Sequence, residues 1–400
     1  MARKPTLDFI YFDAGGGHRS AALALQSVVQ AEGYEWDVRL VNLQQVLDPL
    51  DVFRKVTGVR LQDLYNLLLA KGWTLGATYM LPMMHAVIRV YHKQQVKLLT
   101  EYWRQQRPDM VVSLVPNFNR ALFESLRLAA PGIPFVTVLT DFADYPPHFW
   151  VERQEQYFIC GTPRAAEQAR TRSLSPEKVF LVSGMILRPE FYRAPDIDLL
   201  RERARLGLRA DLPTGLVLFG GEGSNAMFSI AERLGDSSLD LQLIMICGRN
   251  EQLRNRLKKM KTRNRIFVEG FTKEVPYYMR VSDFFIGKPG PGSISEAIRL
   301  NLPVIVECNS WTLPQERYNA CWVREQGVGE VLTNFRGIEH VVRQLLANDR
   351  LATVKKRISQ MDNRAVFEVP RLLANILATH GAAPANSDSP VIREFPAKNA

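Results

Sequence analysis

The sequence has few cysteines and no long uncharged stretch, and each shortage excludes a class of protein. The 400 residues contain four cysteines, Cys160, Cys247, Cys308 and Cys321, and no two have the CxxC spacing of a zinc site. Scattered thiols favour a reduced, cytoplasmic compartment. The longest uncharged run, residues 72–88, is shorter than the ~20 residues that a spanning helix needs. An integral membrane protein is therefore not expected, and the apolar run at residues 7–12 is too short for a secretory signal.

The charge balance favours anionic partners. The chain carries 51 Lys and Arg against 41 Asp and Glu, a net charge of +10. Such an excess suits phosphate-bearing ligands, anionic membrane surfaces and nucleic acid. Nucleic acid ranks last because no basic block is interleaved with aromatic residues. A length of 400 residues exceeds what one core usually holds, so two domains are expected.

Short apolar runs alternate with helical patterns, which predicts an α/β fold. The first such unit is a strand at residues 7–12, a glycine-rich loop, a helix to about residue 30 and a strand at residues 36–41. This order is a βαβ unit and predicts a parallel sheet. A nicotinamide-binding fingerprint is not indicated, because the second strand ends without the acidic residue that binds ribose.

The same alternation continues in two series. Further strands are expected at residues 109–115, 135–139, 156–160, 178–182, 216–219, 241–247, 265–268, 283–286, 303–306 and 330–332. Helices are expected after the glycine-rich loops, at residues 119–129, 163–172, 251–261 and 315–326 and, near the end of the chain, at residues 338–346, 352–361 and 370–379. We expect an N-terminal domain at residues 1–185, a C-terminal domain at residues 186–380 whose last helices can pack back on the first, and a disordered tail at residues 381–400.

Residues 50–106 interrupt this alternation with a long, mainly helical and aromatic insertion flanked by basic residues. Burial against the sheet would explain the apolar or aromatic character of any single residue here. As a whole the pattern also fits an element that dips into lipid beside anionic headgroups. The residues expected at a membrane or at a lipid acceptor are Trp73, Tyr79, Met80, Leu81, Met84 and Arg89.

A glycine-rich stretch at residues 286–297 follows the strand expected at residues 283–286. Glycines let a ligand approach the backbone, and the N-terminus of the next helix, capped by Ser293 or Ser295, can bind phosphate. Glu296, expected in the first turn, can accept hydrogen bonds from two ribose hydroxyls. The alternative is an ordinary Gly-Pro turn with a carboxylate on the helix dipole.

Four motifs in order resemble the glycosyltransferases grouped with MurG and with the plant-type monogalactosyldiacylglycerol synthases, glycosyltransferase family 28. These motifs are residues 13–20 (DAGGGHRS), 188–191 (RPEF), 220–223 (GGEG), and 287–297 (GKPGPGSISEA) with 315–319 (QERYN). The similarity covers residues 6 to about 375 and is nearer to the diacylglycerol branch. It implies the GT-B architecture, in which two Rossmann-like doubly wound domains face each other across a cleft.

The resemblance implies an inverting transfer of a hexose from UDP-galactose or UDP-glucose to a membrane lipid, with diacylglycerol favoured, by a peripheral protein on the inner face of the cell membrane. The donor-binding residues that it implies are Gly16, Gly17, Arg188, Gly221, Glu222, Gly223, Gly290, Gly292, Ser293, Glu296, Gln315, Glu316 and Asn319. No cofactor or metal is expected, since backbone amides and helix dipoles can stabilise the leaving diphosphate. The alternatives are a polyprenyl-diphosphate acceptor, as in MurG, and a non-catalytic protein that binds UDP-sugar or lipid.

His18 is the first candidate for a general base, because it directly follows three glycines at the start of a helix. An imidazole there, with a pKa near ~6.5 that the helix dipole lowers, is neutral at pH 7 and able to accept a proton from an acceptor hydroxyl. The alternative is a histidine bonded to a backbone carbonyl. Asp13 could orient the imidazole or act as the base itself, and the resemblance adds Asp141 as a third candidate.

Overall fold

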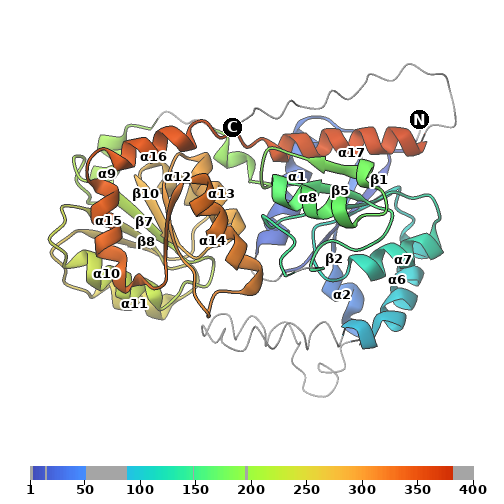
Figure 1. Ribbon diagram of the computed structural model, residues 1–400, viewed down its shortest axis with the longest axis horizontal. Coiled ribbons are helices and arrows are strands. Elements are labelled where there is room, and N and C mark those ends of the chain that lie inside the picture. Colours follow the sequence, from blue (N-terminus) through green and yellow to red (C-terminus); the bar gives the residue numbers. More distant parts are fainter. Residues whose placement is uncertain (1–2, 14–15, 51–87, 147, 194–196, 382–400) are drawn as a thin grey trace.

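The computed structural model describes residues 3–13, 16–50, 88–146, 148–193 and 197–381. Trp73, Tyr79, Met80, Leu81 and Met84 lie outside the described residues, as does the tail from residue 382 onward. Two six-stranded parallel sheets form the frame of the molecule and lie side by side along its long axis (Figure 1).

The first sheet is formed by the N-terminal half of the chain. Its strands have the spatial order β2-β1-β3-β4-β5-β6. The switch point lies between β1 and β3, because β2 was added on one side of β1 and the later strands on the other. They are β1 (Thr6–Tyr11), β2 (Asp37–Asn42), β3 (Met110–Ser113), β4 (Phe135–Val138), β5 (Tyr157–Cys160) and β6 (Val179–Leu181). The main helices on this sheet are α1 (Gly17–Ala31), α6 (His92–Gln106), α7 (Asn119–Ala129) and α8 (Pro163–Arg172), and the short α2 (Leu43–Leu47) follows β2.

The second sheet has the order β12-β11-β10-β7-β8-β9, which is the strand order of dinucleotide-binding domains and reverses between β7 and β10. Its strands are β7 (Thr214–Leu218), β8 (Gln242–Ile246), β9 (Ile266–Glu269), β10 (Phe284–Gly287), β11 (Val304–Glu307) and β12 (Gly329–Leu332). Its helices are α9 (Leu199–Arg205), α10 (Ala226–Gly235), α11 (Glu251–Lys258), α12 (Val275–Arg280), α13 (Pro291–Arg299), α14 (Pro314–Gln326), α15 (Ile338–Leu346) and α16 (Arg350–Ile358).

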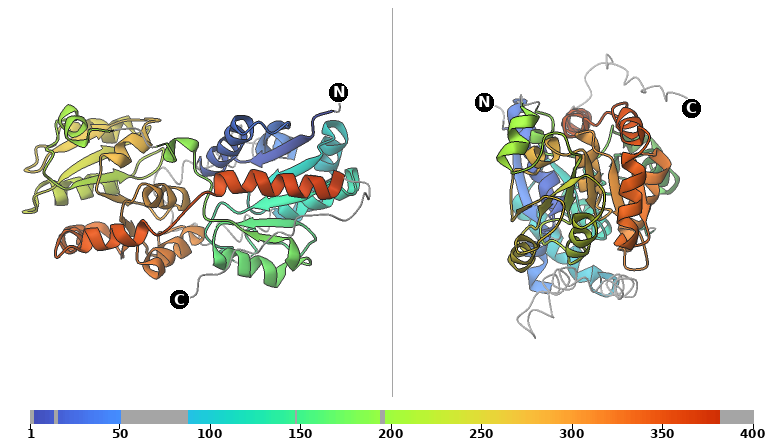
Figure 2. Two further views of the ribbon diagram at one scale, coloured as in Figure 1. Left: turned by 90° about the horizontal axis from the view of Figure 1, so that it is seen from above. Right: turned by 90° about the vertical axis from the view of Figure 1, so that its left-hand side faces the viewer.

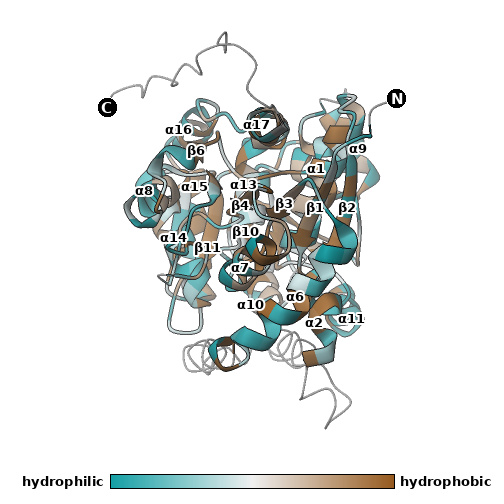
Figure 3. Ribbon diagram, turned by 90° about the vertical axis from the view of Figure 1, so that its right-hand side faces the viewer, coloured by the Kyte–Doolittle hydropathy of each residue, from teal (hydrophilic) through white to brown (hydrophobic). Residues whose placement is uncertain are grey.

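Apolar packing on both faces of each sheet explains why these runs form strands. Every residue of β3, β4, β7, β8 and β10 is buried. Strands covered by helices on both sides read as nearly continuous hydrophobic runs instead of alternating ones. Apolar strands accordingly lie inside and more polar helix surfaces outside (Figure 3).

The last helix, α17 (Ala365–Gly381), returns to the first sheet and packs against α1 (Figures 1 and 2). Its apolar side chains Val366, Val369, Leu373 and Ile376 are buried in one cluster with residues of α1, β1 and β3. The chain therefore crosses twice between the sheets, and the two crossings are bonded to each other. Asn363 Nδ2 donates to the Met185 carbonyl at 3.0 Å, and the Arg364 N–H donates to Ser183 Oγ at 2.7 Å.

Three element expectations differ from the structure. Helix α17 begins at Ala365 and not near residue 370, because Pro370 lies inside the helix instead of starting it. Helices α9 and α12 were not expected, since seven and six residues are too few to show a clear apolar period. By contrast, the bounds of α7, α8 and α15 agree with their sequence patterns.

The anchoring of α17 leads to a stability prediction. Replacing Leu373, which is fully buried, with Ala should lower the free energy of unfolding by about 2–5 kcal/mol, because it removes apolar contacts and leaves a cavity. The matched control Asn375→Ala changes an exposed position of the same helix and should stay within about 0.5 kcal/mol of the parent. Denaturant unfolding measures both. Equal stabilities of the two variants would show that α17 is not anchored as described.

Candidate active site

The loop after β10 leads into α13 at the point where the strand order of the second sheet reverses. Helix α13 begins at Pro291, and Gly290 precedes it with an extended backbone and no side-chain cap. The expected caps, Ser293 and Ser295, are therefore wrong: both lie inside the helix, because proline occupies its first position. Glu296 lies in the second turn and not in the first. The N–H groups of Gly292 and Ser293 still belong to the first turn, where helical geometry leaves them without a partner.

The glycine loop after β7 is held by the loop after β8. Arg249 N–H donates to the Gly221 carbonyl at 2.8 Å, and a Cβ atom on Gly223 would lie 2.6 Å from the Cys247 carbonyl oxygen. Gly223 also has a φ of +64°, so a side chain here is excluded by both space and backbone conformation. Glycine is therefore required at this position by the close packing of the two loops.

The carboxylate of Glu222, in this loop, is paired with an arginine. Its Oε1 lies 2.8 Å from Arg249 Nη1, and the Arg249 guanidinium lies 4.4 Å from the centre of the exposed Phe271 ring. The negative charge of Glu222, unexpected next to a phosphate site, is thus paired.

Lys288 was missed by the sequence reasoning although it lies inside a quoted motif. Its Cε atom is 3.7 Å from the position of a Cβ on Gly220 and 3.6 Å from that of a Cβ on Gly290. Its Nζ lies 3.2 Å from Glu316 Oε1. The side chain therefore places an ammonium group between the loop after β7 and the start of α13. A lysine between a strand end and a helix N-terminus was the signal that could have identified it.

Helix α14 carries the last donor motif. Glu316 is 9% exposed and contacts Lys288, while Gln315 is half-buried at the start of the helix. Asn319 is fully buried, and its Nδ2 donates to the Pro289 carbonyl at 2.9 Å. Asn319 therefore supports the loop after β10, and its expected place around the sugar or diphosphate stays a prediction.

Arg188 and Glu296 come together although they are distant in sequence. Burial raises the pKa of Glu296 to about 7, and the positive charge of Arg188 acts in the opposite direction. Arg188 also lies over the ring of Phe191, 5.3 Å from its centre. Glu296 is half-buried, which leaves part of its surface for a ligand.

His18 lies in the first turn of α1, which Gly16 precedes with a left-handed φ of +79°. Its Nδ1 is 3.1 Å from Thr140 Oγ1, and a hydrogen bond to the Leu114 backbone further holds the half-buried ring. Burial lowers its pKa to about 4, so the imidazole is neutral at pH 7. Thr140, which the sequence reasoning did not consider, thus orients the ring.

Asp13 and Asp141 have different surroundings. Asp13 is exposed and pairs with Arg19 at 3.2 Å, so the expected orientation of His18 by Asp13 is not what this structure has. Asp141 is 8% exposed and accepts a hydrogen bond of 2.8 Å from Trp150 Nε1. Burial raises the pKa of Asp141 to about 7 against the opposing effect of this bond.

The loop of the first domain that carries Asp141 meets residues of the second domain across the domain boundary. The charge of Glu316 contributes to the raised pKa of Asp141, and Lys288 acts against it. Next in sequence to Asp141, Phe142 contacts Trp322 of α14, with ring centres 4.5 Å apart. The carboxyl ends of the two sheets therefore face each other, and this is the edge of an open α/β sheet at which ligands bind.

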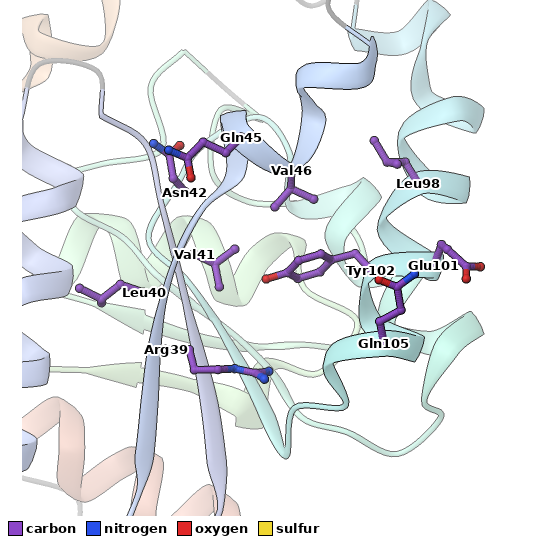
Figure 4. A pocket seen from close by; sticks show the side chains of 10 residues that line it. All are labelled: Arg39, Leu40, Val41, Asn42, Gln45, Val46, Leu98, Glu101, Tyr102 and Gln105. Atoms are coloured by element: carbon purple, nitrogen blue, oxygen red, sulfur yellow. The ribbon is translucent and has the colours of Figure 1, made fainter.

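A separate hollow lies at the outer edge of the first sheet, between β2 and α6 (Figure 4). Tyr102 points from α6 toward Val41, and Arg39 lies at one end. None of the expected site residues lines this hollow, and Arg39 is paired with the buried Asp8 at 2.6 Å. Arg89, expected at a membrane, is exposed just before α6.

Within the described part of the chain, no helix is long and apolar enough to span a membrane. The same residues contain no group of three or more His, Cys, Asp or Glu side chains that could hold a metal ion. Asp198, directly before α9, caps this helix by accepting a hydrogen bond from the Arg201 N–H.

The burial of His18 leads to a titration prediction. Among the six histidines, His18 should titrate near pH 4, whereas an unperturbed imidazole titrates near ~6.5. NMR spectra of the imidazole C–H groups against pH measure this, and the His18→Gln spectrum identifies the resonance. A midpoint near 6.5 for His18 would contradict the environment described.

Comparison with known proteins identifies the family of this chain. The model of the glycosyltransferase family 28 C-terminal domain matches residues 216–373. A probable monogalactosyldiacylglycerol synthase 2 of Oryza sativa subsp. japonica is 30% identical over 335 residues, 79% of this chain and 68% of that protein. A probable monogalactosyldiacylglycerol synthase of Nicotiana tabacum is also 30% identical, over 83% of this chain and 63% of that protein, so this chain spans less than two thirds of the tobacco relative.

Solved structures confirm the expected GT-B fold. MurG of Acinetobacter baumannii aligns with a TM-score of 0.59 at 14% identity, covering 93% of this chain and 100% of that chain. A UDP-GlcNAc 2-epimerase from Neisseria meningitidis aligns with a TM-score of 0.60 at 12% identity, covering 94% and 100%. Because one fold serves both transferases and epimerases, it is the sequence relatives that decide the family. This chain belongs to the monogalactosyldiacylglycerol synthase family of glycosyltransferases, within glycosyltransferase family 28.

Proposed function

We propose that this protein is an inverting glycosyltransferase that moves a hexose from UDP-galactose or UDP-glucose to diacylglycerol. The observation that carries the proposal is the approach of Asp141, which bonds the tryptophan beside the neutral His18, to Lys288 and Glu316 of a dinucleotide-type domain, in a chain whose relatives are named monogalactosyldiacylglycerol synthases. A donor nucleotide would lie on the second domain and the acceptor on the first.

The donor site is built from backbone groups and one lysine. The diphosphate would lie between the loop at residues 220–223 and the first turn of α13, where unpaired N–H groups and the helix dipole favour negative charge. Lys288, placed between these two backbone segments, supplies a positive charge. Glu296 would accept hydrogen bonds from the ribose hydroxyls, in the ionised form that Arg188 favours.

The transfer step requires one base and one stabilised leaving group. His18, neutral at pH 7, takes the proton of the acceptor hydroxyl as that oxygen attacks the anomeric carbon from the face opposite the diphosphate. The bond from the anomeric carbon to the diphosphate oxygen breaks, and UDP leaves with the electron pair. Lys288 and the helix N-terminus stabilise the charge that develops on it. In this proposal no metal ion or cofactor takes part.

Asp141 is a second candidate base. A pKa raised to about 7 makes the ionised form of Asp141 a stronger base than an ordinary carboxylate and leaves it partly ionised at neutral pH. Its bond to Trp150 also suits a positioning role beside the acceptor. Loss of turnover in His18→Ala, with turnover retained in Asp141→Asn, would distinguish the two roles.

We further propose that the protein works at the inner face of the cell membrane as a peripheral protein. The support is the net charge of +10, the exposed Arg89 and the lipid substrate in the names of the relatives. Basic residues near an anionic bilayer each contribute about 1 kcal/mol, an attraction that salt screens. A polyprenyl-diphosphate acceptor, as proposed for a MurG-like reaction, is the alternative on the same fold.

The assay of function offers radiolabelled UDP-galactose or UDP-glucose with diacylglycerol vesicles. The parent should form a labelled glycolipid, and His18→Ala should lower turnover by about 10²–10⁴ while UDP still raises the melting temperature. Transfer of the label to a polyprenyl-diphosphate lipid and not to diacylglycerol would show that the polyprenyl-diphosphate lipid is the acceptor. No transfer by a folded parent that still binds UDP would favour the non-catalytic alternative.

Lys288 can be tested apart from turnover. Replacing Lys288 with Ala should weaken UDP binding about 10- to 100-fold, because a charge-assisted contact to phosphate is lost. Uridine, which lacks phosphate, should bind the variant and the parent alike. The control Lys259→Ala, an exposed lysine beyond α11, should leave both affinities unchanged. Isothermal titration gives the six constants, and an equal loss for uridine would mean that Lys288 acts on the fold of the loop.

A further inference from the structure

Phe142 follows the first sheet in the chain but packs in the core of the second domain. It lies in the loop after β4, directly after Asp141, and is 2% exposed. Its apolar cluster consists mainly of second-domain residues such as Leu218, Phe285 and Ile294. Its ring centre is 4.5 Å from that of Trp322, with the planes tilted by 48°. The ring therefore forms an apolar contact between the domains.

The first-domain side of this contact is held firmly. Thr162, which caps α8, donates from its hydroxyl to the Phe142 carbonyl. The Asp144 carboxylate accepts hydrogen bonds from the backbone N–H groups of His148 and Trp150, at 3.0 and 2.6 Å. Trp150 in turn bonds Asp141. Displacing the Phe142 ring would hence disturb the loop that carries Asp141 and the tryptophan 6.0 Å from the His18 ring.

The second-domain side leads to the donor site. Trp322 lies on α14, six residues or about 9 Å along the axis from Glu316. Glu316 bonds Lys288, and both charges act on Asp141. Helix α14 therefore carries both the partner of Phe142 and the partner of Lys288.

We propose that Phe142 and Trp322 form an aromatic clamp that fixes the acceptor-side groups relative to the donor, which makes Phe142 a positioning residue for the transfer. This inference rests on the proposed function. The paired chain crossings provide one connection between the domains, and the clamp provides a second, next to the reacting groups. Reacting atoms must approach to about 3–3.5 Å, and a displacement of about 1 Å can cost up to about a hundredfold in rate.

The test is a double-mutant cycle on the full chain with Phe142→Ala, Trp322→Ala and the double variant. Each single variant should lower kcat at least about tenfold and leave the Kd for UDP within about twofold. The double variant should be no slower than the slower single variant, because both remove the same contact. Phe142→Leu, which keeps an apolar side chain, should recover part of kcat and covers the case in which Phe142→Ala does not fold. The control Phe123→Ala removes a half-buried ring from α7 and should keep the parent kcat.

Several outcomes would overturn the clamp: an unchanged kcat in folded Phe142→Ala, a parallel loss of UDP affinity, or a double variant as slow as the product of the two single effects. Small-angle X-ray scattering provides a readout without any sugar transfer. Folded Phe142→Ala should show a larger radius of gyration than the parent, and an equal radius would contradict the inference. A parent that transfers no hexose would refute the proposed function, while the scattering result would still decide on the clamp.

Discussion

The common direction of the strands within each sheet is the constraint on which the site depends. Parallel strands bring all their carboxyl ends to one edge, and the reversal of strand order leaves a place there where loops diverge. In the second sheet this place lies between β7 and β10, so the loop at residues 220–223 and the start of α13 are neighbours although some 70 residues separate them. In the first sheet it lies between β1 and β3, beside His18.

Burial at the facing edges sets the protonation states on which the proposed chemistry depends. The same desolvation lowers the pKa of His18 to about 4 and raises those of Asp141 and Glu296 to about 7. It keeps the imidazole neutral at pH 7 and leaves the two carboxyl groups only partly ionised at that pH. Lys288 is held to Glu316, and Arg188 lies near Glu296, so each buried acid has a cation near it. A diphosphate entering this site would meet the ammonium group of Lys288 and unpaired backbone N–H groups.

Much of the fold could be predicted from sequence, because strands buried on both faces leave apolar runs that are easily located. The four motifs also led to the correct family, because they contain residues that loops bring to the carboxyl edges of the two sheets. Three-dimensional contacts without a local pattern could not be predicted. Thr140 orients His18, Asn319 is buried behind the loop and Phe142 enters the other domain, and each of these depends on partners more than 20 residues away. The cap of α13 was misplaced because Ser293 is a common capping residue, whereas Pro291 already starts the helix.

The central claim is that the donor site lies where the carboxyl ends of the two sheets face each other. Hydrogen exchange measured by mass spectrometry, with and without UDP, tests this most directly, because it reports protection of backbone amides wherever the nucleotide binds. We expect slower exchange in peptides covering residues 220–223 and 288–296, and unchanged exchange in β2 and α6, which line the hollow at the outer edge. Protection confined to β2 and α6 would contradict the account.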